Sequence, residues 1–133
     1  MKLNNIIQQK TFDFSIRIIN ASLHIKKKNN EFDLSRQLLR SGTSIGANVE
    51  ESIGAYTTAD FVHKLAIAYK EARETRYWIR LLYATRFLSK DEASSLLKDV
   101  IEICKILAKI QLTVKQKLTA DKKEKKSKLI PKV

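Results

Sequence analysis

One stretch, residues 34–88, decides the fold: LSRQLLRSGTSIGANVEESIGAYTTADFVHKLAIAYKEARETRYWIRLLYATRFL. We predict two helices here, joined by one tight turn. Thr57 lies three residues before Asp60, which is the pattern of a helix N-cap with a reciprocal acid at the third helical position. The second of the two helices is therefore predicted to begin near Thr58.

This second helix carries one stripe of residues at alternating spacings of four and three, which keeps a single face toward a partner helix. No Gly or Pro interrupts it. At 1.5 Å per residue, its roughly thirty residues would make a rod of about 45 Å, so the neighbouring helices should also be long. The stripe consists of Phe61, Leu65, Ala68, Ala72, Thr75, Ile79, Leu82 and Arg86.

The helix before the turn is crowded with small residues at its centre, among them Gly42 and Gly46. Each glycine costs about 1 kcal/mol relative to Ala inside a helix, so we expect another backbone to approach closely as compensation. The pattern leaves one alternative open, in which residues 41–44 form a short loop that breaks the helix in two.

A first helix is predicted from about Asn4 to Lys27, with two neighbouring apolar stripes. A helix in a monomeric bundle needs an apolar face of roughly 100°, so the second stripe suggests contact with another subunit. The first stripe holds Ile7, Thr11, Phe14, Ile18, Ala21 and Ile25. The second holds Phe12, Ile16, Ile19 and Leu23.

A last helix is predicted after Ser89, which forms a capping box with Glu92. Its apolar stripe runs from Leu96 to Val114. Four long amphipathic helices with short connections predict an all-α, antiparallel up-down-up-down four-helix bundle over residues 1–117. From residue 118 the stripe ends, and the Lys-rich segment 118–133 is predicted to be a disordered basic tail.

Composition agrees with a single helical domain and points to a polyanionic partner. The 133 residues include three Gly and one Pro, too few for the turns of a β-sandwich. The net charge is +12, and residues 115–133, with eight Lys against Asp121 and Glu124, carry half of it. Such a balance favours nucleic acid above other partners, although basic proteins also bind membranes and acidic proteins.

Cys104 is the only cysteine, so no internal disulfide can form and the cytoplasm is the expected compartment. A small buried apolar role suits this residue better than that of a reactive thiol. The N-terminus has no signal-peptide pattern, and no stretch reaches the length of apolar residues that a membrane span requires, so no membrane partner is expected.

No set of residues for catalysis is apparent. His24 and His63 lie on different predicted helices, and no HExxH or paired cysteines are present, so we expect neither a metal nor a cofactor. The segment Gly42–Gly46 lacks the Lys-Ser/Thr end of a P-loop. A non-enzymatic role is therefore expected.

The candidate nucleic-acid-binding residues are basic side chains on the first and third helices and in the tail, with aromatic residues beside them for base stacking. They are Lys26, Lys27, Lys28, Arg73, Arg76, Arg80, Arg86, Lys122, Lys123, Lys125 and Lys126. A structural alternative is open. In it Lys70 pairs with Glu74, and Arg73 and Arg76 pair with acids on other helices or subunits.

Two runs carry a resemblance: RQLLRSGTSIGANVEES at residues 36–52 and DFVHKLAIAYKEARETRYWIRLL at residues 60–82. The chain resembles the four-helix-bundle family of 23S rRNA intervening-sequence proteins, whose superfamily includes the accessory variability determinant protein of diversity-generating retroelements. The resemblance implies a homopentamer with a basic surface. Its motif positions, which we interpret as packing and subunit-contact residues, are Arg40, Ser41, Gly42, Ile45, Asn48 and Glu51.

The leading hypothesis is thus a basic oligomer that binds RNA or DNA through its phosphates, mostly without reading the bases. The rival is a protein-interaction scaffold whose charged and aromatic third helix docks a partner such as a reverse transcriptase. The sequence leaves open whether the basic tail or the bundle surface would carry nucleic-acid binding.

Overall fold

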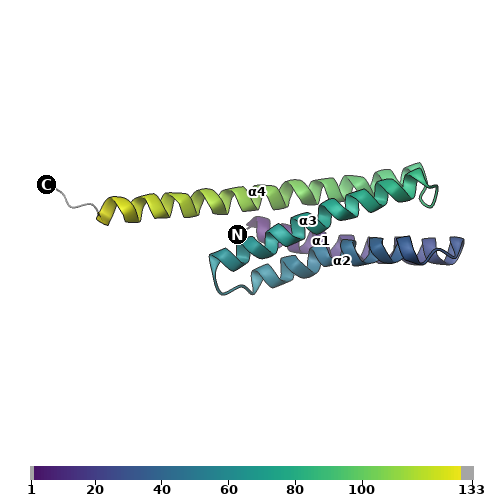
Figure 1. Cartoon of the computed structure of the whole chain (residues 1–133), viewed down its shortest axis with the longest axis horizontal. Helices are drawn as coiled ribbons and strands as arrows, with labels where there is room; N and C mark the ends of the chain where they lie inside the picture. The colour runs from purple at the N-terminus through teal and green to yellow at the C-terminus, as the bar shows by residue number, and fades with distance from the viewer. Residues whose placement is uncertain (1, 130–133) are drawn as a thin grey trace.

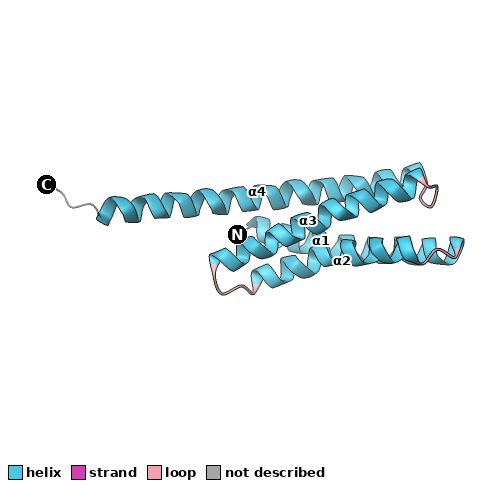
Figure 2. Ribbon diagram, in the orientation of Figure 1, coloured by secondary structure: helices cyan, strands magenta, loops and turns pink. Residues whose placement is uncertain are grey.

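The computed structural model describes residues 2–129, and these residues form four helices without a strand. Consecutive helices run antiparallel and pack side by side, and the last returns to the first, which confirms the predicted all-α up-down-up-down bundle (Figure 1). Short turns join them (Figure 2). The helices are α1 (Lys2–Asn29), α2 (Asp33–Ile53), α3 (Thr58–Ala84) and α4 (Lys90–Leu129).

The helix α2 is continuous through residues 41–44, so the alternative of a loop at that point is wrong. The expected close approach explains why glycines are tolerated there. A Cβ at Gly46 would lie 3.3 Å from the backbone oxygen of Thr11 in α1. Gly42 faces the buried side chain of Ile18. The two glycines thus allow α1 and α2 to pack at short range.

The start of α3 agrees with the prediction, because the Thr57 side chain accepts a hydrogen bond from the Asp60 N–H at 3.1 Å. The end of α3 does not. The sequence stripe extends the helix to Arg86, whereas the helix ends at Ala84. The Phe87 N–H bonds to the Leu82 carbonyl at 2.8 Å, which closes the turn as a Schellman motif, and Arg86 takes a left-handed φ of 69°.

The predicted capping box of α4 is confirmed in both directions. The Glu92 N–H donates to Ser89 Oγ at 3.1 Å, and the Ser89 N–H donates to Glu92 Oε1 at 3.0 Å. Two of the unpaired N–H groups at the start of α4 are thereby satisfied.

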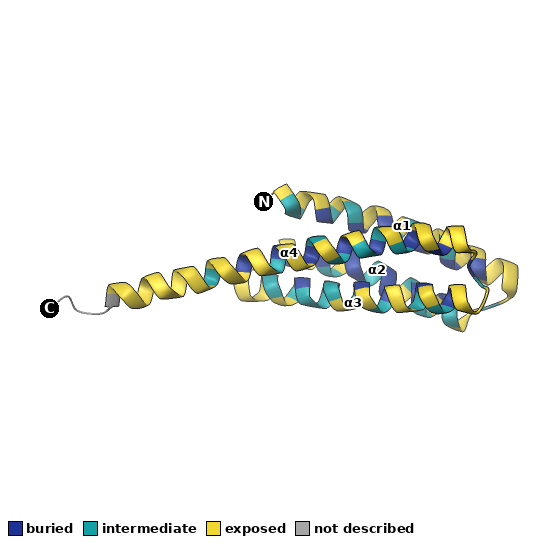
Figure 3. Ribbon diagram, turned by 90° about the horizontal axis from the view of Figure 1, so that it is seen from above, coloured by how far each residue is buried: buried dark blue, intermediate teal, exposed yellow. Residues whose placement is uncertain are grey.

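The last helix continues beyond the bundle, contrary to the prediction of a disordered tail from residue 118. Residues 118–129 are helical, and residues 130–133 of the predicted tail lie outside the described residues. Lys, Glu, Ala and Leu, which occur in this segment, are good helix formers, and Glu124 pairs with Lys128 at 3.1 Å one turn away. Leu118 is the last residue packed against the core, and residues 119–128 are exposed (Figure 3).

The two stripes of α1 have different surroundings. Ile7, Phe14, Ile18 and Ile25 are buried in the core. The second stripe lies outside the core, and each of its side chains is exposed over a large part of its surface within residues 2–129. The exposed fractions of its four side chains are 63% for Phe12, 47% for Ile16, 40% for Ile19 and 58% for Leu23. We call these four residues the α1 stripe.

Candidate nucleic-acid interface

The charges of α3 are sorted between two flanks of the helix. Glu71 and Glu74 both pair with Arg40 on α2, the first at an N–O distance of 3.4 Å. The structural alternative supposed that Lys70 pairs with Glu74. In the structure, Glu74 pairs with Arg40 instead. The acids of this part of α3 therefore lie on the flank that faces α2.

The arginines of α3 lie on the other flank. At 100° per residue, Arg73, Arg76 and Arg80 fall within about 60° of one another on the helix surface, and all three are exposed. Within residues 2–128, no carboxylate lies at ion-pair distance from any of them. The intrachain ion pairs that the structural alternative supposed for Arg73 and Arg76 are thus not formed.

This arginine flank adjoins α4. Burial raises the pKa of the Cys104 thiol on α4, and the positive charges of Arg76 and Arg73 oppose that shift. Since the acids of α3 face α2 and α4 also packs against α3, the arginine flank lies toward α4. The thiol is half-buried and its pKa is raised, which suits a packing role rather than a reactive one.

Exposed aromatic rings accompany these arginines. The exposed fractions are 55% for Tyr77 and 47% for Tyr83. Trp78 is half-buried and packs edge-on against Tyr77, with ring centroids 5.3 Å apart. An aromatic face beside a cationic one is a surface on which a base can stack while its phosphates are neutralised.

The other predicted binding residues lie at the two ends of the molecule (Figure 1). Lys26, Lys27 and Lys28 end α1, at the end of the bundle where Arg86 occupies the α3–α4 turn. The ammonium of Lys26 sits 5.6 Å from the centroid of the Phe32 ring. The tail lysines lie at the opposite end, since α4 rises about 48 Å from Lys90 to Lys122. The structure therefore divides the predicted set into three groups.

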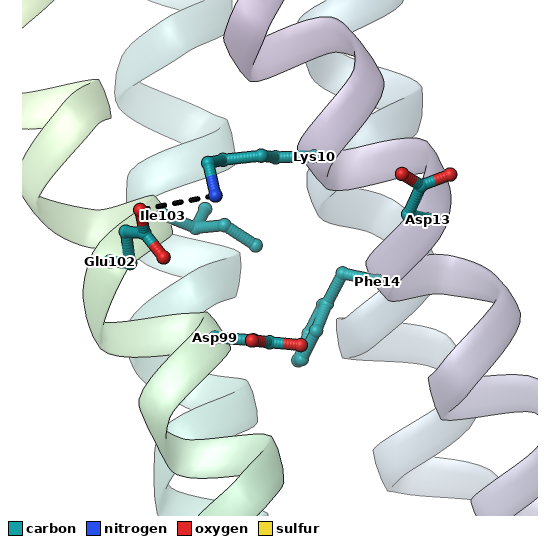
Figure 4. Close-up of a pocket in the computed structure, with 6 residues that line it drawn as sticks. All are labelled: Lys10, Asp13, Phe14, Asp99, Glu102 and Ile103. Carbon is teal, nitrogen blue, oxygen red and sulfur yellow. Dashed lines mark ion pairs between the residues drawn. The ribbon is translucent and has the colours of Figure 1, made fainter.

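A hollow of about 180 Å³ lies between α1 and α4, and it is unsuited to a polyanion. Three of its lining residues are acids, Asp13, Asp99 and Glu102 (Figure 4). Lys10 reaches Glu102 at 3.1 Å, and Arg17 pairs with Asp99. Among the described residues, no group of three or more His, Cys, Asp or Glu side chains is placed to hold a metal ion.

Most of the motif residues named by the resemblance join helices. Besides Arg40 and Gly42, Ser41 accepts a hydrogen bond from Thr75 on α3 at 3.0 Å, and Ile45 is fully buried. Glu51 pairs with Lys64 on α3 at 2.8 Å and raises the pKa of that lysine. Asn48 donates to the Ser44 carbonyl within α2 at 2.8 Å. Arg40, Ser41, Gly42, Ile45 and Glu51 thus lie at contacts between helices or in the core, whereas Asn48 bonds within α2; the packing and subunit-contact roles stay predictions.

Sequence reasoning missed two lysines, Lys105 and Lys115, that lie on the same side of α4 as the predicted Lys122, Lys123 and Lys126. Both are exposed. The helical period could have identified them, because lysines before and after residue 118 recur on the same side of one continuous helix. The prediction of a disordered tail assumed that the helix ends near residue 118, so this period was not followed beyond it.

Comparison with known proteins agrees with this architecture. The model of the family described as 23S rRNA-intervening sequence protein matches residues 3–109. A solved structure from Bacteroides thetaiotaomicron VPI-5482, a protein of unknown function from the S23 ribosomal protein family, is 43% identical. The match covers 79% of this chain and 97% of that one, with a TM-score of 0.78. No curated protein matches the chain. None of the helices in residues 2–129 has the length and apolarity to cross a membrane.

Proposed function

The chain belongs to the 23S rRNA-intervening sequence protein family, and from this premise we propose that it is a non-enzymatic, oligomeric nucleic-acid-binding protein. The ligand is RNA in the first instance, as the family description suggests. Binding is through phosphates, which Lys and Arg neutralise with release of counterions.

One observation carries this proposal: the arginine flank of α3 holds only positive charges. Arg73, Arg76 and Arg80 are exposed and have no acid partner within residues 2–128, while Glu71 and Glu74 are engaged on the other flank. Three guanidinium groups on one side of a helix repel one another unless an anion lies between them. A phosphate backbone supplies such anions at regular intervals.

The test is a fluorescence-anisotropy titration of the full chain against structured RNA, single-stranded RNA and duplex DNA at several salt concentrations. We expect the logarithm of affinity to fall linearly with the logarithm of salt concentration, with a slope of about −0.7 to −0.9 per phosphate contacted. A variant with Arg73→Gln, Arg76→Gln and Arg80→Gln should bind more weakly and show a shallower slope. The control variant removes three exposed cations elsewhere, Lys2, Arg36 and Lys90.

Failure to bind any of the three nucleic acids near physiological salt would overturn the proposal. Equal losses for the two triple variants would show that only net charge matters, and would remove the α3 flank as the site. In either case the scaffold hypothesis would become the leading one, and binding would be sought with a protein partner such as a reverse transcriptase.

The α1 stripe supports the oligomeric part of the proposal. Four large apolar side chains at helical spacing, each 40% to 63% exposed within residues 2–129, are more than a bundle surface needs. The partner we propose for this stripe is a second copy of the chain, and the family resemblance suggests a pentamer. In a closed ring each copy would bring one α3 arginine flank, which would multiply the phosphate contacts available to one nucleic acid.

A further inference from the structure

The part of α4 beyond the bundle lies outside the match to the family model. That match ends at residue 109, whereas α4 continues to Leu129. Leu118 packs against the core and residues 119–128 are exposed, so the segment 119–128 contributes little to the fold. An isolated helix of this length is marginal in water, and a surface that binds it would stabilise it.

The charges on α4 are sorted between two sides along its length. At 100° per residue, five exposed lysines fall within a sector of about 100°. No Asp or Glu lies in this sector from residue 101 to residue 128. We call these five residues the α4 lysine face: Lys105, Lys115, Lys122, Lys123 and Lys126.

The acids of α4 lie on the opposite half of the helix. Within the bundle, Asp99 and Glu102 turn toward α1, where Arg17 and Lys10 pair with them. Beyond the bundle, Glu124 pairs with Lys128. Lys117, Lys125 and Lys128 share that half with Glu124 and Asp121, so their charges are partly compensated. The predicted tail lysines are thus not equivalent, and Lys125 is outside the lysine face.

The α4 lysine face is continuous with the arginine flank of α3. The helices α3 and α4 pack against each other, and at 100° per residue Cys104 falls in the sector of the lysine face. Burial raises the pKa of its thiol, and the positive charges of Arg76 and Arg73 oppose that shift, which agrees with a lysine face that begins beside the arginine flank. From Cys104 to Lys126 the helix rises about 33 Å, which is close to one turn of duplex. Together the two surfaces form one basic track along the molecule.

Resting on the proposed function, we infer that the α4 lysine face extends the nucleic-acid site of the α3 arginine flank, and binds the phosphodiester backbone beyond the bundle. A membrane surface fits less well, because the extension has no wide apolar side to insert. An acidic protein also fits less well, because protein interfaces are depleted in lysine and depend on apolar or aromatic anchors, which this face lacks.

The test compares two triple variants of the full chain that lose the same charge from the same helix. The first carries Lys115→Gln, Lys122→Gln and Lys126→Gln on the lysine face. The second carries Lys117→Gln, Lys125→Gln and Lys128→Gln on the opposite half. Gln has nearly the helix propensity of Lys, so circular dichroism should show the same helix content for both.

We expect the first variant to lose roughly tenfold to a hundredfold in affinity for a 20-base-pair duplex, of RNA or of DNA, near 150 mM salt. Its salt slope should be shallower by about 2 to 3 units. The second variant should lose less than about threefold. Duplexes much shorter than about ten base pairs should not distinguish wild type from the first variant, because they cannot reach both ends of the track.

The outcomes separate this inference from the proposed function. Equal losses for both variants on the long duplex would overturn the lysine face, while binding by the wild type would leave the proposed function in place. No binding by the wild type would overturn both. If the wild type binds acidic vesicles or polyglutamate as tightly as the duplex at this salt, the phosphodiester assignment is wrong.

Discussion

Gly42 on α2 faces Ile18 on α1 so closely that a Cβ at position 42 would lie 2.6 Å from Ile18 Cγ2. Ile18 is completely buried, so its side chain has no free space into which it could move. The absence of a side chain at residue 42 is therefore a packing requirement, and it fixes the distance between the first two helices.

Gly42→Ala should destabilise the protein. The gain in helix propensity is about 1 kcal/mol, but overpacking against a buried side chain costs about 1 to 3 kcal/mol. Gly54→Ala is the control, because its Cβ would meet only the Glu51 carbonyl at 3.8 Å and its φ of −85° suits any residue. Chemical denaturation should show a lower midpoint for the first variant and an equal or higher one for the second. An unchanged midpoint for Gly42→Ala would mean that the helices separate at little cost.

Arg86→Gly should stabilise the protein. Arg86 has a φ of 69° at the position of a Schellman motif where glycine is preferred, and a left-handed conformation costs a non-glycine residue about 1 to 2 kcal/mol. Part of that gain is lost through the greater freedom of glycine in the unfolded chain, so we expect a net gain of about 0.5 to 1 kcal/mol.

Thr85→Gly is the matched control for the turn. Thr85 has a φ of −94° and donates its hydroxyl to the Leu81 carbonyl at 2.7 Å, so glycine should destabilise there. If Arg86→Gly also lowers the thermal midpoint, the conformation of Arg86 is not the dominant cost at this turn. A loss of RNA affinity in a stabilised Arg86→Gly protein would show that Arg86 is kept for binding at the expense of stability.

The fold could be predicted from the sequence to the extent that periodicity and caps determine it. The starts of α3 and α4 follow from Thr57 and Ser89, since an N-cap is a local signal that needs no tertiary contact. The end of α3 could not be predicted, because Arg86 keeps the stripe in phase although the chain has already turned. Likewise, the Lys-rich composition of residues 118–130 is typical of disordered segments. The only sequence feature that indicated a helix there was the absence of Gly and Pro before Pro131.

For the candidate site, the sequence predicted individual basic residues but not which of them lie together or which are neutralised by acids. Composition and charge singled out Arg73, Arg76 and Arg80, and the structure places them together. Which acids neutralise which bases depends on neighbouring helices, so the engagement of Glu74 by Arg40 could not be read from the i,i+4 spacing of Lys70 and Glu74. The separation of Lys26 from the tail lysines is also a property of the topology rather than of the local sequence.

The capping box of α4 should make stability depend on pH. Hydrogen bonds with Ser89 lower the pKa of the Glu92 carboxyl from its ordinary value of 4.5, and the positive charges of His24 and Lys28 act in the same direction. Because the folded pKa is the lower one, the carboxylate contributes stability above about pH 4.5. That contribution is lost as the pH falls through the folded pKa.

Glu92→Gln should therefore cost about 0.5 kcal/mol near pH 7, and the difference from wild type should shrink as the pH falls below 4.5. Asp91→Asn, an exposed first-turn acid that Ser89 does not engage, is the control. The measurement is urea denaturation of all three proteins from pH 7 to pH 3. A difference between wild type and Glu92→Gln that is constant over this range would contradict the assigned role of the carboxylate.

Ile16→Asp, at the middle of the α1 stripe, should reduce the oligomeric state. Ile16 is 47% exposed in the single chain, so a charge at this position is solvated in a monomer but would be buried without a partner in an interface. Asn20→Asp is the matched control, since Asn20 is an exposed residue of α1 outside the stripe. Analytical ultracentrifugation should show a smaller assembly for the first variant and an unchanged one for the second, with equal helix content by circular dichroism. If the wild type is itself a monomer at micromolar concentration, the stripe does not join copies of the chain, and the proposal of an oligomer is wrong.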